Sequence, residues 1–285
     1  RPAKSGDPTL AAYFDCVRAG GVAISAHRAV SAPDQAENSI RAIEATGAAI
    51  PGAIVELDVV FTRDGELVLM HDQTLERTTT GRGRVSDLRL AELSSVRLKA
   101  SNGAATQERI PTLKAALDAA GRAGVIASID LKPAPGESTV DLARSVVEVV
   151  RRSSAQHRVI LITYNRSDAE AVAALAPEMM ISAGVDAVED LEGMRAPQIL
   201  AWTGTRQERP QLWRALNAAG VEVQFGTLGA EGVRRDDRYA EDGDVSEYRD
   251  LVRQGVSVIA TDTPLAARSV LGAELAKAAA CPRPD

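Results

Sequence analysis

The sequence predicts an α/β fold, a (β/α)8 barrel, and three observations support this prediction. Short apolar segments alternate with amphipathic segments along the chain, and strands that alternate with helices imply a parallel sheet. Eight such units fit into 285 residues, which is a usual length for one barrel of this kind. No segment has the composition of an interdomain linker, so we expect residues 1–285 to form a single barrel domain.

The individual elements follow from local composition. Runs rich in β-branched and apolar residues predict strands at 22–27, 53–60, 67–71, 125–131, 159–164, 179–183, 198–202, 221–227 and 256–261. Amphipathic segments predict helices at 38–48, 112–122, 138–154, 167–176, 187–194, 209–219, 246–254 and 264–279. Helix ends are marked by the N-cap residues Asn38, Thr112, Ser138 and Ser167, by Pro264 at a helix start, and by Gly124 and Gly220 at helix ends.

Two segments interrupt the alternation. Residues 73–111 contain a polar, glycine-rich stretch, TTTGRGRVSD, and a short helical piece. Residues 229–245 are charged and poor in apolar side chains. We expect both to be long loops, the first as a small insertion after the second strand of the barrel.

The composition argues against nucleic acids and membranes as partners. The net charge is −6 and the pI about 5.3, which disfavours nucleic acid or an anionic membrane surface as a partner. No apolar run approaches the roughly 20 residues of a membrane span, so we expect no integral membrane segment. Composition and charge give no indication of the oligomeric state.

The two cysteines, Cys16 and Cys281, lie near opposite ends of a chain that starts at Arg1 rather than Met. In the cytoplasm they would be two unrelated thiols, whereas an exported protein can pair them. Since the first and last strands of a barrel are neighbours, the segments carrying these cysteines can approach each other. We therefore expect a Cys16–Cys281 disulfide in a periplasmic or secreted protein, with a cytoplasmic protein as the alternative.

Three acidic side chains stand out because they belong to apolar strands. Glu56 and Asp58 are two residues apart in AIVELDVVF, so both point to one face of the strand. Asp130 occupies a similar place in IASIDLK. At the open end of a barrel these three would form a carboxylate cluster that repels itself unless a cation neutralises it. Hard oxygen ligands select Mg²⁺ or Ca²⁺, so we expect one divalent cation here.

Two of the three histidines, His27 and His71, end predicted strands beside these acids. Imidazoles near a metal can act as general base and general acid around neutral pH. Arg28 can bind an anionic oxygen, preferably of phosphate. This set of residues predicts hydrolysis of a phosphodiester.

Other interpretations compete at each position. The acids Glu56 and Asp58 could be solvated at a strand end, and Asp130 could simply pair with Lys132. A strand-end Lys132 could form a Schiff base, as in an aldolase. Arg28 could serve as a structural partner of Glu37 or Asp72.

Three further residues lie at strand ends or starts. His157 precedes the strand at 159–164, so we expect it at the opposite end of the barrel in a structural or exposed position. Tyr164 and Trp202 end later strands at the open mouth. Each could line a pocket for an alcohol or pack against its neighbours.

A set of short motifs resembles the glycerophosphodiester phosphodiesterase family, which includes phospholipase-C-like phosphodiesterase barrels. The pairs His27-Arg28 and Glu37-Asn38, the triplet at 56–58, T-x-D-G at 62–65, and His71-Asp72 occur in the family's order. They are followed by R-T-T-x-G-x-G at 77–83, acid-x-Lys at 130–132 and T-D-x-P at 261–264.

The resemblance implies a (β/α)8 barrel with an inserted segment, here 73–111. It implies one divalent metal on Glu56, Asp58 and Asp130, and catalysis by the two motif histidines. It places Arg28 and Lys132 on phosphate-contact positions and Glu37 in the first or second shell of the site.

The expected reaction converts a glycerophosphodiester to a phosphomonoester and an alcohol. The sequence departs from the family pattern at Ala29, which follows the His-Arg pair, and at Asp130, which stands in place of Glu. It also departs at Thr163-Tyr164, in place of a Ser-Phe pair, and at FGTLG, which replaces a Trp-x-x-Asn-like end of the seventh strand. Because some of these departures fall on the alcohol pocket, a xenobiotic or lipid diester is an alternative substrate. A catalytically silent binding protein is the alternative from another class.

Overall fold

The computed structural model of this chain describes residues 9–284, and its centre is a closed barrel of eight parallel strands. The barrel strands are β1 (Ala23–Ala26), β2 (Ile54–Phe61), β4 (Ile126–Leu131), β5 (Val159–Ile162), β6 (Met180–Gly184), β7 (Ile199–Trp202), β8 (Glu222–Gly226) and β9 (Val258–Thr261). Strand β1 pairs in parallel with both β2 and β9, which closes the sheet. The predicted fold class is therefore confirmed.

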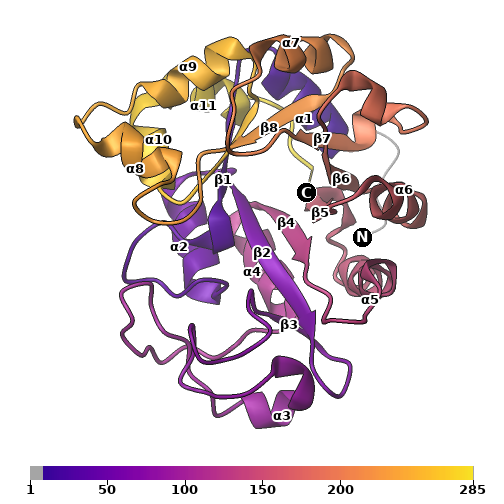
Figure 1. The fold of residues 1–285 in the computed structure, drawn as a ribbon, viewed down its shortest axis with the longest axis vertical. Helices are drawn as coiled ribbons and strands as arrows, with labels where there is room; N and C mark the ends of the chain where they lie inside the picture. Colours follow the sequence, from indigo (N-terminus) through magenta and orange to yellow (C-terminus); the bar gives the residue numbers. More distant parts are fainter. Residues whose placement is uncertain (1–8, 285) are drawn as a thin grey trace.

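Helices surround these strands (Figure 1). The longer ones are α1 (Leu10–Arg18), α2 (Ile40–Ala49), α4 (Leu113–Ala123), α5 (Thr139–Arg152), α6 (Arg166–Leu175), α7 (Pro210–Ala218), α9 (Glu247–Gln254), α10 (Pro264–Val270) and α11 (Gly272–Ala279). The short helical segments are α3 (Leu90–Leu93), α8 (Arg235–Ala240), η1 (His27–Ala29), η2 (Val85–Asp87), η3 (Gln156–Arg158), η4 (Val188–Leu191) and η5 (Ala196–Gln198). Within residues 9–284, no helix has the length and apolarity needed to cross a membrane.

Several predicted helices differ from the observed ones. The segment 187–194 forms only the 3-10 turn η4, because Glu192 leaves helical geometry with a ψ of 126° and Gly193 follows it with a left-handed φ of 82°. The segment 264–279 divides at Leu271 into α10 and α11, since Leu271 leaves helical geometry just before Gly272. Helices α1 and α8 were not predicted at all.

Capping explains where the remaining helices begin. Thr112 and Ser138 accept hydrogen bonds from the first turns of α4 and α5, as predicted. Helix α2 is capped by Ser39 rather than by the expected Asn38. Helix α6 is capped by Asn165 rather than by the expected Ser167. At the other end of α4, Gly124 adopts the expected left-handed conformation with a φ of 63°.

The strand expected at 67–71 is not part of the barrel. It is the shorter β3 (Leu67–Leu69), which runs antiparallel to the end of β2, with Val59 opposite Leu69. Strand β2 is eight residues long, so its carboxyl end overhangs the barrel and can pair with a returning strand. The segment after β3 contains α3 and extends beyond the ring of helices (Figure 1). It packs around its own apolar cluster, which includes Leu75, Val85 and Leu98.

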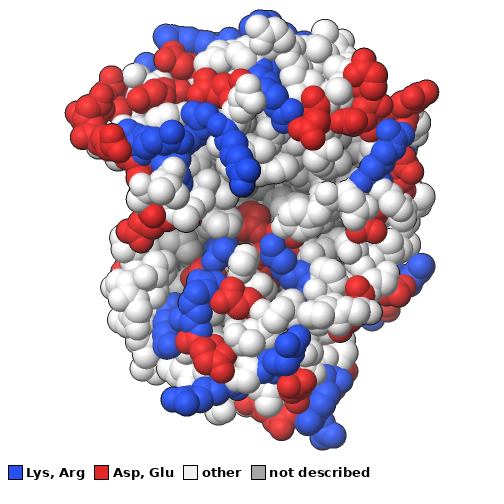
Figure 2. Space-filling model, viewed as in Figure 1, with Lys and Arg blue, Asp and Glu red and all other residues white. Residues whose placement is uncertain are grey.

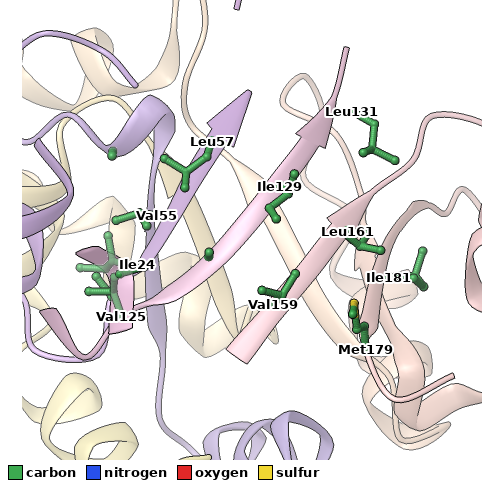
Figure 3. Close-up of a cluster of buried hydrophobic side chains, with 14 of the residues drawn as sticks. Ile24, Val55, Leu57, Val125, Ile129, Leu131, Val159, Leu161, Met179 and Ile181 are labelled. Carbon is green, nitrogen blue, oxygen red and sulfur yellow. The ribbon is translucent and has the colours of Figure 1, made fainter. Parts of the chain in front are cut away.

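Alternation along the strands separates the core from the site. The outward side chains of β2, Val55, Leu57 and Val59, pack with Ile24, Ile129 and similar residues of neighbouring strands against the helices (Figure 3). The inward side chains of β2 are Ile54, Glu56 and Asp58. Ile54 belongs to a separate apolar cluster with Tyr13, Phe14 and Val17 of α1, which closes the amino-terminal end of the barrel. The opposite end, where the strands finish, is left for polar side chains.

The expected disulfide is present. Cys16 of α1 and Cys281, just after α11, are bonded, with their Cα atoms 5.8 Å apart. It joins the two terminal segments that flank the barrel.

Candidate active site

The three predicted acids come together at the carboxyl end of the barrel. The register of β2 on β4 places Asp58 directly beside Asp130, and Glu56 lies one pleat deeper on the same face. One carboxylate oxygen from each residue lies within 4.8 Å of the other two. All three residues are buried, so water screens their mutual repulsion poorly.

The electrostatics of this cluster fit a divalent cation. Burial, followed by the charges of Asp58 and Asp130, raises the pKa of Glu56 well above its usual range. Burial also raises the pKa of Asp130, although Lys132 opposes this shift. Within the described residues, Oδ1 of Asp130 is buried without a hydrogen-bond partner. Three buried carboxylates with a spare oxygen suit a hard cation such as Mg²⁺ or Ca²⁺.

Two residues with left-handed backbone conformations, Arg28 and Asn38, orient the acids. The N–H of Arg28 donates to Oε2 of Glu56 at 2.8 Å. The side-chain NH2 of Asn38 donates to Oδ2 of Asp58 at 2.7 Å, and Oδ1 of Asn38 accepts from the backbone N–H of Asp58 at 2.9 Å. Arg28 and Asn38 both have left-handed φ angles, 52° and 57°, which turn these groups towards β2. Asn38 was predicted to cap a helix, and its place in the E-N motif was the available signal for this role.

Lys132 lies against the same acids. Its Nζ is 2.6 Å from Oδ2 of Asp130 and 3.5 Å from Oδ1 of Asp58. Burial opposes the charged amine, but these carboxylates raise the pKa of Lys132 overall. The hydroxyl of Tyr164 donates to Asp130 and lies 3.0 Å from Nζ. The ion pair considered as an alternative for Asp130 and Lys132 is thus present, and it borders the acidic cluster.

Each of the two motif histidines is held by a carboxylate. Nδ1 of His27 lies 2.6 Å from Oδ1 of Asp262, which follows β9. Nδ1 of His71 lies 2.7 Å from Oδ1 of Asp72. Burial opposes ionisation of Asp262, but the His27 hydrogen bond and nearby charges lower its pKa overall. Because an ionised carboxylate only accepts hydrogen bonds, Nδ1 carries the proton in both rings and Nε2 remains available.

His71 reaches the site for a reason that differs from the prediction. We expected it to end a barrel strand, but β3 is antiparallel and lies outside the barrel. The pairing continues beyond β3, with the N–H of Met70 donating to the carbonyl oxygen of Asp58 at 3.0 Å. The hairpin therefore returns His71 to the level of the acids.

A chain of charged side chains joins the two histidine-bearing segments. Arg28 bonds both carboxylate oxygens of Glu37, at 3.1 and 3.0 Å. Arg77 bonds Glu37 through two 2.9 Å contacts and Asp72 through contacts of 2.6 and 2.8 Å. The Arg77 hydrogen bond is the main cause of a strongly lowered pKa at Asp72. The Arg28–Glu37 pair considered from the sequence is present.

The roles of Asp72, Arg77 and Asp262 in holding the histidines were missed. All three residues lie inside motifs noted in the sequence, and that was the available signal. His157 is not part of this arrangement: it lies in η3, directly before β5.

Two cavities open at this end of the barrel. One, of about 510 Å³, is bordered by both histidines, by Glu56, Asp130 and Lys132, and by Tyr164 and Trp202. The other, of about 680 Å³, is bordered by Glu37, Arg77, Arg234 and several small polar residues. Both cavities share His27, Arg28 and Gly229. Figure 2 shows this face hollowed near its middle, with acidic atoms in the hollow and Lys and Arg side chains around it.

The fold and site thus define a (β/α)8 barrel whose carboxyl end carries a group of acidic residues that could hold a metal ion. Residues 27–266 match the model of the glycerophosphoryl diester phosphodiesterase family, and the chain belongs to this family. Its members among the similar proteins are phosphoric diester hydrolases.

Curated relatives match parts of the chain. A glycerophosphodiester phosphodiesterase of Caldanaerobacter subterraneus subsp. tengcongensis is 31% identical over 132 residues, which are 45% of this chain and 52% of the relative. Glycerophosphodiester phosphodiesterase 1 of Mus musculus is 42% identical over 115 residues, 39% of this chain and 34% of the relative. The matching part of the chain thus spans about half of the first relative and a third of the second.

Solved structures match nearly the whole chain. A glycerophosphoryl diester phosphodiesterase of Parabacteroides distasonis superposes with a TM-score of 0.76 and 28% identity, covering 91% of this chain and 92% of that one. A phosphodiesterase of Oleispira antarctica, in complex with the product sn-glycerol-3-phosphate, has a TM-score of 0.70 and 24% identity, with coverage of 90% and 99%. At 24% identity, the similarity to the Oleispira antarctica protein is evidence for the fold alone.

Proposed function

We propose that this protein is a metal-dependent hydrolase of glycerophosphodiesters that releases a phosphomonoester and an alcohol. The observation that carries the proposal is the buried acidic cluster flanked by two histidines, each of which has Nδ1 engaged by a carboxylate. A binding protein without catalytic function would need the acids and phosphate ligands but not two imidazoles held in one tautomer.

Glu56, Asp58 and Asp130 would hold one divalent cation, Mg²⁺ or Ca²⁺. When bound, the cation neutralises the acids and stabilises negative charge on the phosphoryl oxygens. The unpartnered Oδ1 of Asp130 supports this assignment, since its other oxygen is engaged by Lys132 and Tyr164.

The phosphate group would contact Arg28 and Lys132, two cations that border the 510 Å³ cavity. Glu37 orients Arg28 through its two contacts with that guanidinium. His27 and His71 would share the roles of general base and general acid, each using Nε2. One removes a proton from the attacking hydroxyl and the other donates a proton to the departing oxygen.

The two cavities would accommodate the two alcohol groups of the diester. They meet at His27 and Arg28, where the phosphate group would lie. The sn-glycerol-3-phosphate complex of the Oleispira antarctica protein supports a small glycerol-containing substrate. Tyr164 and Trp202 would line the pocket for one alcohol, because both border the cavity that contains the acids.

A second candidate substrate is an amphiphilic diester, such as a lipid. Among the described residues, the exposed large hydrophobic side chains are Tyr164, Val233 and Leu265, with 66%, 69% and 41% of their surface accessible. All three follow barrel strands at the end where the site lies. Preferential cleavage of a lysophospholipid over its deacylated counterpart would favour this candidate.

The deciding experiment is a panel of phosphodiesters assayed with and without EDTA, with products identified. We expect glycerol phosphate and a free alcohol from glycerophosphodiesters, loss of activity in EDTA, and recovery with Mg²⁺ or Ca²⁺. Absence of turnover on the whole panel, with substrate still bound, would instead support a silent binding protein.

The disulfide between Cys16 and Cys281 supports a periplasmic or secreted location, where such bonds persist. Thiol labelling of the protein as isolated from fractionated cells tests this. Two reactive thiols and recovery in the cytoplasmic fraction would contradict it.

A further inference from the structure

Asp236 is a buried carboxylate in a charged segment that the sequence predicts to be a long loop. It lies at the start of α8, in the charged stretch 229–245, and only 1% of its surface is accessible. An ionised carboxylate withdrawn from water is costly unless donors surround it. The identity of these donors shows what the residue does.

Three donors from two other elements converge on Asp236. Its Oδ1 accepts from the hydroxyl of Tyr248 at 2.7 Å and from that of Thr261 at 2.8 Å. Its Oδ2 accepts from the backbone N–H of Asp262 at 2.7 Å. The side chain therefore fastens the loop after β8 to the end of β9.

Asp262 is the residue that holds His27, and the same loop supplies its other contacts. Oδ1 of Asp262 engages Nδ1 of His27 at 2.6 Å. Its Oδ2 lies 3.1 Å from a guanidinium nitrogen of Arg234 and accepts from the N–H of Gly229 at 3.1 Å. With the bond from Asp236, the loop makes three polar contacts with Asp262, one to its backbone N–H and two to its carboxylate.

We propose that Asp236 is a positioning residue for His27, acting through Asp262. Asp236 sets the backbone of Asp262, the Asp262 carboxylate sets the orientation and tautomer of His27, and Nε2 of His27 is thereby aimed into the cavity. The link to turnover rests on the proposed phosphodiesterase function, whereas the geometric coupling does not. Since proton transfer is sensitive to displacements of about 1 Å, a distant hydrogen bond can affect the rate strongly.

The test uses Asp236→Asn. The amide keeps the volume of the side chain but retains one acceptor oxygen, so it cannot receive all three donors. We expect kcat on an alkyl glycerophosphodiester to fall roughly 10- to 100-fold with KM within about 2-fold, because substrate contacts are untouched. The matched control is Asp244→Asn, an exposed acid of the same segment whose bonds go to Ser246; its kcat should equal that of wild type.

A second readout requires no substrate. In ¹⁵N-histidine-labelled protein, the Nδ1 protons of His27 and His71 should give two downfield signals, assigned with His27→Gln and His71→Gln. Asp236→Asn should shift or broaden the His27 signal and leave that of His71 unchanged. If the protein cleaves no phosphodiester, this measurement still tests the coupling, so the two failures are distinguishable.

A double variant separates positioning from general destabilisation. If Asp236 acts through Asp262, adding Asp236→Asn to Asp262→Asn should lower kcat by less than about 2-fold further. The proposal would be overturned if the kcat losses of the two single variants multiplied in the double variant. An unchanged His27 signal in folded Asp236→Asn would overturn it as well. Should that variant not fold, Tyr248→Phe replaces it: we expect the His27 signal to shift and kcat to fall roughly 2- to 10-fold, and no change in either would overturn the proposal.

Discussion

Asp130 divides its two oxygens between different tasks. Oδ2 contacts Lys132 and Tyr164, while Oδ1 is buried and has no partner among the described residues. Its neighbour Asp58 is fixed by Asn38 on one side and faces Lys132 on the other. The acids are therefore held in place by hydrogen bonds before any cation binds, which reduces the reorganisation that binding requires.

The first prediction concerns the cation. Glu56→Gln and Asp58→Asn should each abolish high-affinity binding of Mg²⁺ or Ca²⁺ in isothermal titration calorimetry, because each removes a charged oxygen ligand and no core packing. Without metal, Glu56→Gln should resist denaturant at least as well as wild type, since it removes both the burial of a charge and the repulsion from Asp58 and Asp130, which together raise the pKa of Glu56.

The matched control is Asp118→Asn, which changes a partly exposed acid paired with Lys114 on α4, away from the site. Its affinity for the cation should be that of wild type. Undiminished binding in both site variants would show that the acids are not the ligands.

The second prediction concerns the histidines. A general acid matters most for a poor leaving group, so one of His27→Ala and His71→Ala should retain far more activity on a p-nitrophenyl diester than on an alkyl diester. The other should lose both alike, as expected of a base, with each loss roughly 10²- to 10⁴-fold. The double variant should lose less than the product of the two, because both groups serve one reaction.

His157→Ala is the control for this pair. His157 lies in η3, at the amino-terminal end of β5, so its loss should leave kcat/KM nearly unchanged on both esters. Equal losses on both substrates for His27→Ala and His71→Ala would contradict the division into acid and base.

At the scale of elements, the contact of α1 with β8 buries an ionisable group outside the site. Glu222, at the start of β8, is 3% exposed and pairs with Arg18 of α1, while Ser257 donates to its second oxygen at 3.2 Å. Burial raises the pKa of Glu222 to about 8, and the Arg18 charge offsets only part of that shift. We therefore expect the packing of α1 against the amino-terminal end of the barrel to depend on pH.

The third prediction follows from this pKa. Between pH values of about 4.5 and about 8, folded Glu222 retains a proton that the unfolded chain has lost, so the free energy of unfolding should decrease as pH rises through this window. The decrease should amount to a few kcal/mol. Urea denaturation at pH 5 and pH 8 measures it.

The comparison variant is Glu222→Gln, which does not titrate. Its free energy of unfolding should change less between these two pH values than that of wild type. Parallel changes in the two proteins would show that Glu222 titrates normally in the folded state.

At the scale of the whole molecule, the disulfide joins segments 265 residues apart. A cross-link that closes so long a loop restricts the unfolded chain much more than the folded one. The fourth prediction is that Cys16→Ser combined with Cys281→Ser lowers the free energy of unfolding by about 2–5 kcal/mol in urea denaturation.

Reduction provides the control for the disulfide. Dithiothreitol should lower the urea midpoint of wild type and leave that of the double variant unchanged. Equal midpoints for oxidised wild type and the double variant would show that the bond adds no stability.

Much of the fold and half of the site could be predicted because the signals are local. Period-two alternation predicts the strands, and a spacing of two places Glu56 and Asp58 on one face. By contrast, α1 was not predicted, although Thr9 is a favourable N-cap residue and the apolar residues Leu10, Tyr13, Phe14 and Val17 follow a helical spacing. Segment 229–245 was predicted only to be a long loop. The burial of Asp236 within it depends on donors from α9 and β9, which lie 12 and 25 residues further along the chain.

Local sequence patterns predict the alternation of strands and helices, the acids in apolar strands, and the motifs that carry His27 and His71. Tertiary structure decided the register that sets Asp58 beside Asp130, the antiparallel hairpin that returns His71 to the mouth, and the carboxylates that hold both imidazoles. The physical reason is that local patterns fix which face a side chain occupies. Which atoms then meet depends on hydrogen-bond pairing between segments distant in the chain.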